Sequence, residues 1–422
     1  MDIQPIGPQQ RNLNGSDYFL LWAGVAISLA EIWAGGFLAP MGFWYGLWAI
    51  LLGHLIGNTF MALGGIIGSE YGITSMVSVR PSFGIRGSNL AAVLNIIQLI
   101  GWASIMLIIG GRAGAMLGAP IGGLPAADEF WIVSIGLGTL IWALYTGRPI
   151  WKLLQTVAVV ALLLVLILMT VVSMRTFGGR PPAVPVQAMP FMIGLDLVIA
   201  MPISWMPLVA DYARFSRRTR PAFWNTWWGY FLVSSWMYLL GLTATMVTGE
   251  TDPGALILQV MGQVGLAVPA LILVVFSTIT SDFPDVYSAT CSVLNISEKV
   301  SARVVMWVAG VLAILVALVF PMEQYENFLL FIGAMFVPLF GVVLTDYFWL
   351  RRRQLDPEAL FQVGGPYWYR GGFHITALVA WALGFAVYWL AVHFTVLGGS
   401  LPSILTAGLV YAGLTRPSRK VV

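Results

Sequence analysis

The sequence predicts an all-α integral membrane protein with about twelve transmembrane helices. Of its 422 residues, 59% are hydrophobic and only 9% are charged, whereas soluble domains carry roughly 25% charged residues. Long apolar runs recur along the chain, and about 20 apolar residues suffice to cross the hydrocarbon core of a bilayer. All but three of the 21 Lys and Arg residues, namely Arg112, Arg175 and Arg180, fall in alternate loops. This positive-inside bias places both termini in the cytoplasm.

Twelve apolar runs, separated by polar, glycine-rich or proline-rich segments, are expected to span the membrane. They cover approximately residues 18–42, 44–68, 88–111, 129–146, 150–174, 191–213, 223–248, 262–292, 303–320, 325–349, 374–394 and 397–415. An even number of spans agrees with both ends lying on the basic side. The single cysteine, Cys291, cannot form a disulfide within the chain, so no oxidising compartment is implied. We therefore expect a multi-pass protein of the cell inner (plasma) membrane.

The first and sixth spans contain helix-breaking residues. The first carries Gly35, Gly36 and Pro40 close to Glu31, and the sixth carries Pro202 and Pro207 around Trp205. Breaks at membrane depth are tolerated where the freed backbone is buried or lines a cavity. Interrupted helices at matching positions of two halves indicate a transporter built from inverted repeats, although glycine and proline are also commoner in membrane helices generally.

These features divide the chain as follows: a cytoplasmic N-terminus (1–17), an inverted-repeat transport core (18–349, with halves 18–174 and 191–349), a cytoplasmic loop (350–373), two additional transmembrane helices (374–415) and a cytoplasmic tail (416–422). The halves show no clear residue-level identity, so the repeat is inferred from the helix breaks.

Three carboxylates at membrane depth are candidates for function. An ionisable group in the bilayer is costly and is retained mainly where it acts. Glu31 lies in the middle of the first span, and Asp282 and Asp285 share one helical face in the eighth. The alternative is a buried hydrogen-bonded group that holds helices together. Asp196, near the outer end of the sixth span, is expected to be solvated.

Uncharged polar residues supply two further candidate sites. Ser277, Thr280 and Ser281 in the eighth span offer hydroxyl oxygens of the kind that sodium prefers, although such hydroxyls also join helices. Gln98 and Trp102 lie one turn apart in the third span and could bond to, and stack on, a flat polar ring. Alternatively, both could pack between helices.

Several other functions find no support in the sequence. The three histidines lie in unrelated positions, and no nucleophile, metal or nucleotide motif stands in a suitable context. We therefore expect neither an enzyme nor a cofactor, no nucleic acid partner and no obligate protein partner, with membrane lipid as the surrounding medium. A transporter-like sensor is a third alternative, but no output domain is visible.

Four short motifs resemble the nucleobase:cation symporter-1 family, which includes bacterial cytosine permease. They occur in the family's order and spacing from the first to the tenth span: IWAGG at 32–36, SVRPSFGIRGS at 78–88, ADYARF at 210–215 and DYFWLRRR at 346–353. Within the family, the chain looks most similar to the branch thought to carry hydroxymethylpyrimidine, a thiamin precursor. The resemblance implies a five-plus-five inverted repeat of the LeuT-like kind, alternating access and cation coupling, usually to sodium.

The resemblance also implies roles for particular residues. Sodium would be held by the backbone carbonyls of Gly24 and Ile27 and by the hydroxyls of Ser277, Thr280 and Ser281. The base would stack on Trp102 and contact Gln98. The second stacking aromatic of the relatives falls on Pro202, and Trp205, one turn along, would replace it.

Two carboxylates stand where the family has neutral groups. Glu31 replaces a small residue, and Asp282 replaces an amide that reads the base; Asp285 lies on the same face. Because carboxylates accept from exocyclic amino groups, we hypothesise that Glu31 and Asp282 select an aminopyrimidine without a ring carbonyl. The expected function is import of a small planar nitrogen heterocycle by cation symport. The nearest alternative is a cytosine or purine permease, and a proton stays open as the coupling ion.

Overall fold

The computed structural model describes residues 3–144, 149–178, 189–281, 283–297 and 299–415, and within this part it is helical throughout, without a β-strand. The long helices are α1 (Gly15–Ala26), α2 (Leu29–Gly36), α3 (Phe43–Tyr71), α5 (Ser88–Ala115), α7 (Asp128–Leu144), α8 (Pro149–Phe177), α9 (Phe191–Ser204), α10 (Met206–Ala213), α11 (Thr219–Thr248), α13 (Ala267–Ser281), α14 (Phe283–Ile296), α15 (Ala302–Val319), α16 (Tyr325–Leu344), α17 (Ile375–Phe394) and α18 (Ser400–Leu414).

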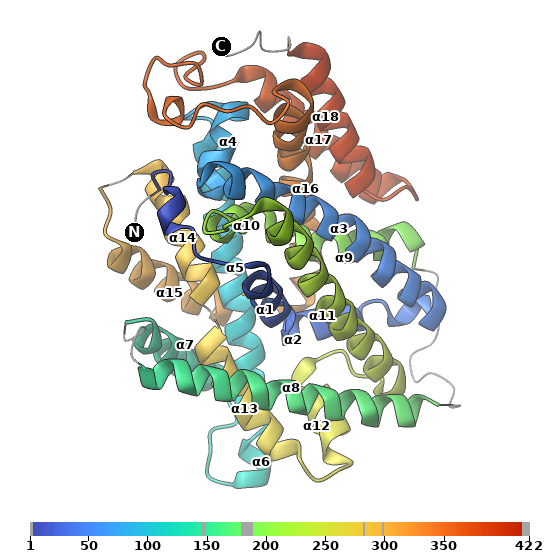
Figure 1. Cartoon of the computed structure of the whole chain (residues 1–422). Helices are drawn as coiled ribbons and strands as arrows, with labels where there is room; N and C mark the ends of the chain where they lie inside the picture. The colour runs from blue at the N-terminus through green and yellow to red at the C-terminus, as the bar shows by residue number, and fades with distance from the viewer. Residues whose placement is uncertain (1–2, 145–148, 179–188, 282, 298, 416–422) are drawn as a thin grey trace.

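Shorter elements join these helices. They are α4 (Ser75–Phe83), α6 (Gly118–Ile121) and α12 (Pro253–Gly262), with 3-10 turns η1 (Pro8–Gln10), η2 (Ala39–Met41), η3 (Met322–Gln324) and η5 (Ala359–Phe361) and a π-helical turn η4 (Thr345–Leu350). In Figure 1, α4, the loop before α17 and the C-terminal end of α18 lie at the top, whereas α6 and α12 lie at the bottom. The opposite ends of the bundle thus carry the loops expected on opposite sides of a membrane.

Each expected span corresponds to one helix or to a pair of consecutive helices. The first is α1 with α2, the sixth is α9 with α10, and the eighth contains α13 and α14. By length and composition alone, eight helices of the described residues could cross a membrane, or nine when the bent pair α1–α2 counts as one span. The shorter apolar helices, among them α18, fall below that length.

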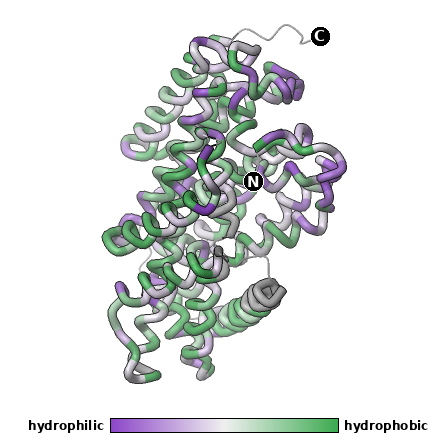
Figure 2. Tube along the Cα trace, turned by 90° about the vertical axis from the view of Figure 1, so that its left-hand side faces the viewer, coloured by the Kyte–Doolittle hydropathy of each residue, from purple (hydrophilic) through white to green (hydrophobic). Residues whose placement is uncertain are grey.

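Apolar side chains cover both the inside and the outside of the bundle. Figure 2 shows apolar residues along most of the helical tube, with hydrophilic residues gathered mainly in the connecting segments. Large side chains on outer helices are well exposed, for example Leu164 of α8, Leu315 of α15 and Leu409 of α18. A water-facing surface would not carry so many such residues, so these faces suit lipid.

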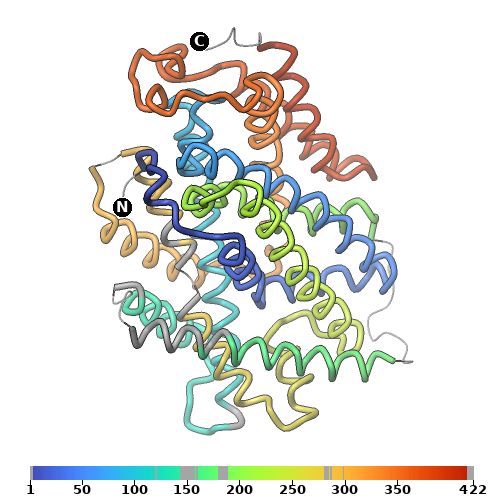
Figure 3. The backbone as a smooth tube through the Cα atoms, in the orientation of Figure 1, coloured from blue at the N-terminus to red at the C-terminus, as the bar shows by residue number. Residues whose placement is uncertain are grey.

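The interrupted helices lie in the middle of the bundle. α2 packs on α11, and α9 and α10 pack on α3. Figure 3 shows this central group with α17 and α18 at one edge, where they pack on each other and on α16. Asp196 of α9 is buried at this edge and accepts hydrogen bonds from the backbone nitrogens of Gly399 and Ser400. It therefore caps α18, and the expectation that Asp196 is solvated was wrong.

Candidate functional site

The first span is broken between α1 and α2, which meet at an angle of 58°. The chain leaves the helix at Ile27 and is extended at Ser28 (φ −139°, ψ 139°). The Ser28 side chain then caps α2 by accepting from the Ala30 nitrogen at 3.2 Å. A serine cap satisfies one of the free amide groups at a helix start. The break therefore lies one turn before Glu31, which occupies the first turn of α2.

Gly35 and Gly36 do not form this break, contrary to the expectation from the sequence. Both are helical residues at the end of α2, where this helix crosses α11. A Cβ on Gly35 would overlap the backbone of Tyr238, and one on Gly36 would lie 2.7 Å from Oγ1 of Thr245. The two glycines are needed because the backbones of α2 and α11 approach each other closely.

The sixth span is interrupted more narrowly, at Trp205. Pro202 and Pro207 lack the amide hydrogen that would close the regular helical ladder on either side. The nitrogen of Leu208 bonds to the Trp205 carbonyl at 3.0 Å, one residue short of its helical partner Ser204. The two helices still form one continuous span, Phe191–Ala213, and the interruption presents the Ser204 carbonyl to a neighbouring side chain.

Gln98 of α5 uses this carbonyl. Its Nε2 donates to the Ser204 carbonyl oxygen and to Oδ1 of Asn95, both at 2.8 Å. Asn95 in turn donates to Oγ of Ser292 in α14. Both donor hydrogens of Gln98 are therefore occupied, whereas its buried Oε1 has no hydrogen-bond partner among the described residues. Gln98 can still accept a hydrogen bond from a ligand, but it has no donor to offer.

Glu31 is held in a similar way. Only 2% of its surface is exposed, and Oε1 accepts from the hydroxyl of Tyr230 in α11 at 2.7 Å. The same hydroxyl accepts from the indole nitrogen of Trp205 at 2.9 Å. The second carboxylate oxygen, Oε2, is buried and has no hydrogen-bond partner within the described residues. Glu31 is thus tied to the interruption of the sixth span while one oxygen stays available.

Trp102 is connected to the same region through Tyr325 of α16. The ring centroids of Trp102 and Tyr325 lie 6.0 Å apart in an edge-to-face arrangement. The Tyr325 hydroxyl donates to the carbonyl oxygen of Ala30, the residue next to Glu31, at 3.0 Å. The indole Nε1 of Trp102 is buried without a hydrogen-bond partner in the described part of the chain.

These contacts group six side chains around the two helix interruptions, some joined directly and some through the backbone of Ser204 or Ala30. We call them the aromatic cluster, and its members are Glu31, Tyr230, Trp205, Gln98, Trp102 and Tyr325. Three of its polar atoms have no hydrogen-bond partner among the residues that the structure describes: two acceptors, Oε2 of Glu31 and Oε1 of Gln98, and one donor, Nε1 of Trp102. An unpaired buried polar group costs free energy, and a bound ligand can supply the missing partner. The predicted residues Glu31, Gln98, Trp102 and Trp205 are therefore brought together.

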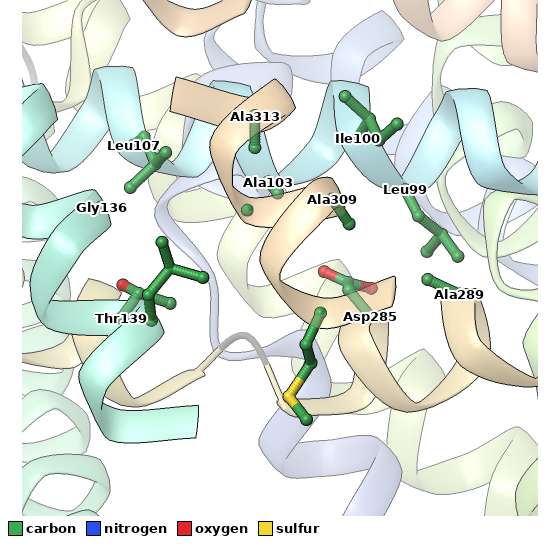
Figure 4. Close-up of a pocket in the computed structure, with 13 residues that line it drawn as sticks. Leu99, Ile100, Ala103, Leu107, Gly136, Thr139, Asp285, Ala289, Ala309 and Ala313 are labelled. Carbon is green, nitrogen blue, oxygen red and sulfur yellow. The ribbon is translucent and has the colours of Figure 1, made fainter. Parts of the chain in front are cut away.

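Asp285 lies at a different place. It faces a small cavity of about 50 Å³ between α5, α7, α14 and α15, whose lining includes Leu99, Ala103 and Thr139. Figure 4 shows the Asp285 carboxylate among apolar side chains, and no residue of the aromatic cluster lines this cavity. Leu99 and Ala103 directly follow Gln98 and Trp102 in the chain. Because successive residues of a helix point in different directions, the cavity and the aromatic cluster lie on different faces of α5. Asp282 lies outside the described residues.

The residues expected to hold sodium are only partly described. Gly24 and Ile27 lie at the end of α1, where the Gly24 carbonyl accepts from the Ile27 nitrogen at 3.2 Å. Ser277 in α13 is buried, and its hydroxyl donates to the Val274 carbonyl at 3.0 Å. The side chains of Thr280 and Ser281 lie outside the described part. The sodium site therefore stays a prediction.

His54 is the residue that the sequence analysis missed. It is fully buried in α3, and its Nε2 lies 2.6 Å from Oγ of Ser234 in α11. A lone histidine in an apolar run gave no signal, because its partner lies 180 residues further along the chain.

Comparison with known proteins agrees with this architecture. The chain is 26% identical to the cytosine permease of Escherichia coli (strain K12) over 344 residues, which cover 79% of this chain and 76% of the permease. It is 28% identical to the putative purine-cytosine permease YxlA of Bacillus subtilis (strain 168) over 319 residues, covering 71% and 67%. The inward-facing structure of Mhp1 superposes with a TM-score of 0.84 at 21% identity, covering 97% of this chain and 91% of Mhp1.

A second structure of Mhp1 resembles the chain equally well. It is described as a nucleobase-cation-symport-1 family transporter in a closed conformation with bromovinylhydantoin bound, and it superposes with a TM-score of 0.82 at 20% identity, covering 97% of this chain and 93% of Mhp1. These likenesses show the LeuT-like fold of interrupted membrane helices. Residues 5–414 match the family described as permease for cytosine/purines, uracil, thiamine, allantoin, and the chain belongs to this family.

Proposed function

We propose that the protein imports a small aminopyrimidine, with hydroxymethylpyrimidine as the leading candidate, by cation symport. Alternating access of the inverted repeats would carry the ligand across the plasma membrane, with both chain termini in the cytoplasm as the basic loops suggest. The observation that carries the proposal is the set of polar atoms in the aromatic cluster that have no hydrogen-bond partner among the described residues, namely two acceptors and one donor.

The chemistry of these atoms matches an exocyclic amino group. An amino group donates two hydrogen bonds, which Oε2 of Glu31 and Oε1 of Gln98 could accept. The indole N–H of Trp102 could donate to a ring nitrogen or to a hydroxymethyl oxygen. A ring carbonyl such as that of cytosine offers only an acceptor, which a carboxylate repels. The indole rings of Trp102 and Trp205 supply flat apolar surfaces of the kind that bind heterocycles.

The fixed position of Glu31 would also let it distinguish between ligands of different charge and shape. Its position is set by Tyr230 on Oε1, so Oε2 has little freedom to move away from the ligand. Because a site built to bond a polar group rejects an analogue that lacks it by large factors, replacement of Glu31 should alter preference as well as affinity. Asp282, which occupies the position of a base-reading amide in the resembling family, is proposed as a second such contact.

Sodium is proposed as a coupling ion, bound by the Gly24 and Ile27 carbonyls together with Ser277, Thr280 and Ser281. The broken end of α1 supports this proposal, because such a helix end lacks regular partners for its carbonyl groups. Cation binding between the first and eighth spans would join elements that must move together.

A cytosine or purine permease is the second candidate. The similarity to proteins named cytosine permease and purine-cytosine permease favours it. This alternative predicts tight binding of cytosine or a purine, together with weak binding of an aminopyrimidine that has no ring carbonyl.

A binding screen of pyrimidines and purines, with sodium or with choline as the only added cation, tests both candidates. The proposal expects hydroxymethylpyrimidine to bind most tightly, sodium to strengthen the binding, and Ser277→Ala to weaken the sodium effect. Glu31→Gln should reduce the preference for aminopyrimidines over cytosine at least tenfold. An unchanged preference in this variant, with transport intact, would contradict the role of Glu31. Counterflow of labelled ligand in proteoliposomes separates transport from binding alone.

A further inference from the structure

The start of α11 carries an exposed surface that is basic at one end and aromatic at the other. Three arginines come first, two in the connection that precedes the helix and one in its first turn. Two tryptophans and a leucine follow the last arginine at intervals of four residues, so they lie along one side of the helix. We call this surface the arginine–tryptophan stripe, and its members are Arg217, Arg218, Arg220, Trp224, Trp228 and Leu232.

The protein itself leaves this stripe without partners. Trp224, Trp228 and Leu232 are exposed by 47%, 46% and 49%, and the three arginines are exposed as well. Among the described residues, none of the three guanidinium groups forms an ion pair or donates a hydrogen bond. Other arginines, such as Arg11 and Arg80, donate to backbone carbonyl groups. The positive charges of the stripe are therefore available to a partner outside the chain.

Hydrogen bonds hold the backbone that carries the arginines. The nitrogen of Leu13 donates to the Phe215 carbonyl at 3.0 Å, and the nitrogen of Arg217 donates to the Leu13 carbonyl at 3.1 Å. The Ser216 hydroxyl donates to the Arg218 carbonyl at 2.9 Å. Leu13 precedes α1, and the connection at 214–218 follows α10, so a ligand on the stripe would act on the ends of both interrupted spans.

The length of α11 places the stripe across the boundary between lipid headgroups and acyl chains. The helix has 30 residues and is therefore about 45 Å long, whereas the hydrocarbon core of a bilayer is about 30 Å thick. Its first turns consequently reach the headgroup region. Trp228 lies about 12 Å along the axis from Arg220, toward the middle of the membrane. Tryptophan is enriched at this interface, below the level of the charged groups.

The chemistry of the stripe fits an anionic phospholipid. A guanidinium group can bind a phosphate through two parallel hydrogen bonds. The exposed indoles and Leu232 offer an apolar surface to an acyl chain of the same molecule, and an indole N–H can donate to an ester carbonyl. A free phosphate would use the arginines alone, and an acidic soluble protein would not reach side chains at the depth of the acyl chains.

We propose that the arginine–tryptophan stripe binds an anionic phospholipid, with the headgroup phosphate on the arginines and one acyl chain along Trp224 and Trp228. The bound lipid stabilises the connection between α10 and α11 and, through Leu13, the segment before α1. This inference does not depend on which substrate is carried, because no residue of the stripe belongs to the aromatic cluster.

Native mass spectrometry of the full-length protein in a neutral detergent, titrated with phosphatidylglycerol or with phosphatidylcholine, tests the proposal. We expect the wild-type protein to bind phosphatidylglycerol at least tenfold more tightly than phosphatidylcholine. Each basic residue near a membrane surface contributes about fivefold to such binding, so Arg217→Gln combined with Arg220→Gln should weaken phosphatidylglycerol binding at least tenfold. Equal affinity of the wild-type protein for the two lipids would overturn the proposal.

Lys299→Gln combined with Arg370→Gln is the matched control. Both residues are exposed and lie in other basic loops, so this variant loses the same charge without touching the stripe. Its affinity for phosphatidylglycerol should stay within about twofold of the wild-type value. Equal losses in the two variants would show a general attraction of the lipid to the net charge of the protein, and the proposed site would be wrong.

The same spectra distinguish other occupants of the stripe. Glycerol phosphate, which has no acyl chain, should not displace phosphatidylglycerol; displacement would identify a free phosphate as the ligand and overturn the lipid site. A wild-type dimer that becomes a monomer in the arginine variant would show that the stripe joins two copies of the chain instead. Thermal unfolding in nanodiscs completes the test. Phosphatidylglycerol should stabilise the wild-type protein more than the arginine variant, and equal stabilisation of the two proteins would contradict the proposal.

Discussion

Replacing Tyr230 by Phe removes one oxygen atom that joins both interrupted spans. The Tyr230 hydroxyl donates to Oε1 of Glu31 and accepts from Nε1 of Trp205, and the side chain is fully buried. A neutral hydrogen bond contributes about 0.5–1.5 kcal/mol net and a bond to a charged group about 1.5–3 kcal/mol, and buried partners left unpaired add to the loss. We therefore expect Tyr230→Phe to lower the free energy of unfolding by about 2–4 kcal/mol.

Tyr238→Phe is the matched control on the same face of the same helix. Tyr238 is equally buried, but its hydroxyl has no hydrogen-bond partner among the described residues. Its removal should be neutral or slightly stabilising, because no bond is lost and one unpaired group disappears. Each variant lacks one phenol oxygen of the wild-type protein, so the change in side-chain volume is the same in both and cancels in the comparison.

Denaturant unfolding in nanodiscs, followed by tryptophan fluorescence, measures the stability of both variants. Equilibrium binding of hydroxymethylpyrimidine measures whether Glu31 and Trp205 stay in position, and we expect Tyr230→Phe to weaken binding at least tenfold, which corresponds to about 1.4 kcal/mol. If the free energies of unfolding of the two variants differ by less than about 0.5 kcal/mol, the Tyr230 hydroxyl does not hold the aromatic cluster together and the reasoning fails.

Three further predictions concern other parts of the fold. Gly241→Ala should prevent folding, because its Cβ would overlap the Ile32 carbonyl, whereas Gly413→Ala has open space and should fold normally, as fluorescence-detected gel filtration can show. Arg351→Gln removes the ion-pair partner of buried Asp346, which then keeps only the hydrogen bonds from Ser82 and Tyr411, and should cost about 3 kcal/mol in denaturant unfolding. Burial lowers the pKa of His374 from 6.5, so the unfolded chain binds the extra proton and stability falls as pH drops below about 6.5; His374→Gln should remove this loss in thermal unfolding.

Composition and loop charge were sufficient to predict the class of fold. The chain has too few charged residues to cover a water-facing surface, and its basic residues lie in alternate loops. Both features constrain the whole chain, whatever the arrangement of the helices. The helix breaks indicated the inverted repeat, the family resemblance implied it as well, and the match over residues 5–414 confirms the family. The narrower assignment to hydroxymethylpyrimidine depends on two carboxylates and stays a prediction.

The position of the first break was harder to predict. Glycine pairs indicate flexibility and close packing equally well, and the sequence does not show which applies at Gly35 and Gly36. In the structure these residues pack on α11, while Ile27 and Ser28, which carry no glycine or proline signal, leave the helix. Tertiary contact, rather than local preference, decides between the two positions.

The partners of the polar residues could not be predicted at all. Gln98 was expected either to bond to a ligand or to pack between helices, and the sequence did not show that its nitrogen bonds to Asn95 and to the Ser204 carbonyl of the sixth span. His54 gave no sign of a catalytic or metal-binding role, and its bond to Ser234 could not be read from the sequence. Such pairs join helices far apart in the chain, and neither hydrophobic pattern nor spacing carries information on them.

One face of α11 carries both the residues that pack against α2 and the residue that bonds to Glu31. Tyr230, Ser234, Tyr238, Gly241 and Thr245 follow one another at intervals of three or four residues, so they share one face of α11. Gly241 lets the two backbones touch, and this contact brings Glu31 within reach of Tyr230. A larger residue at the crossing would separate the carboxylate from Tyr230 without touching the proposed ligand. Under the proposed function, substrate selection would therefore depend on this backbone contact as well as on the residues that face the substrate.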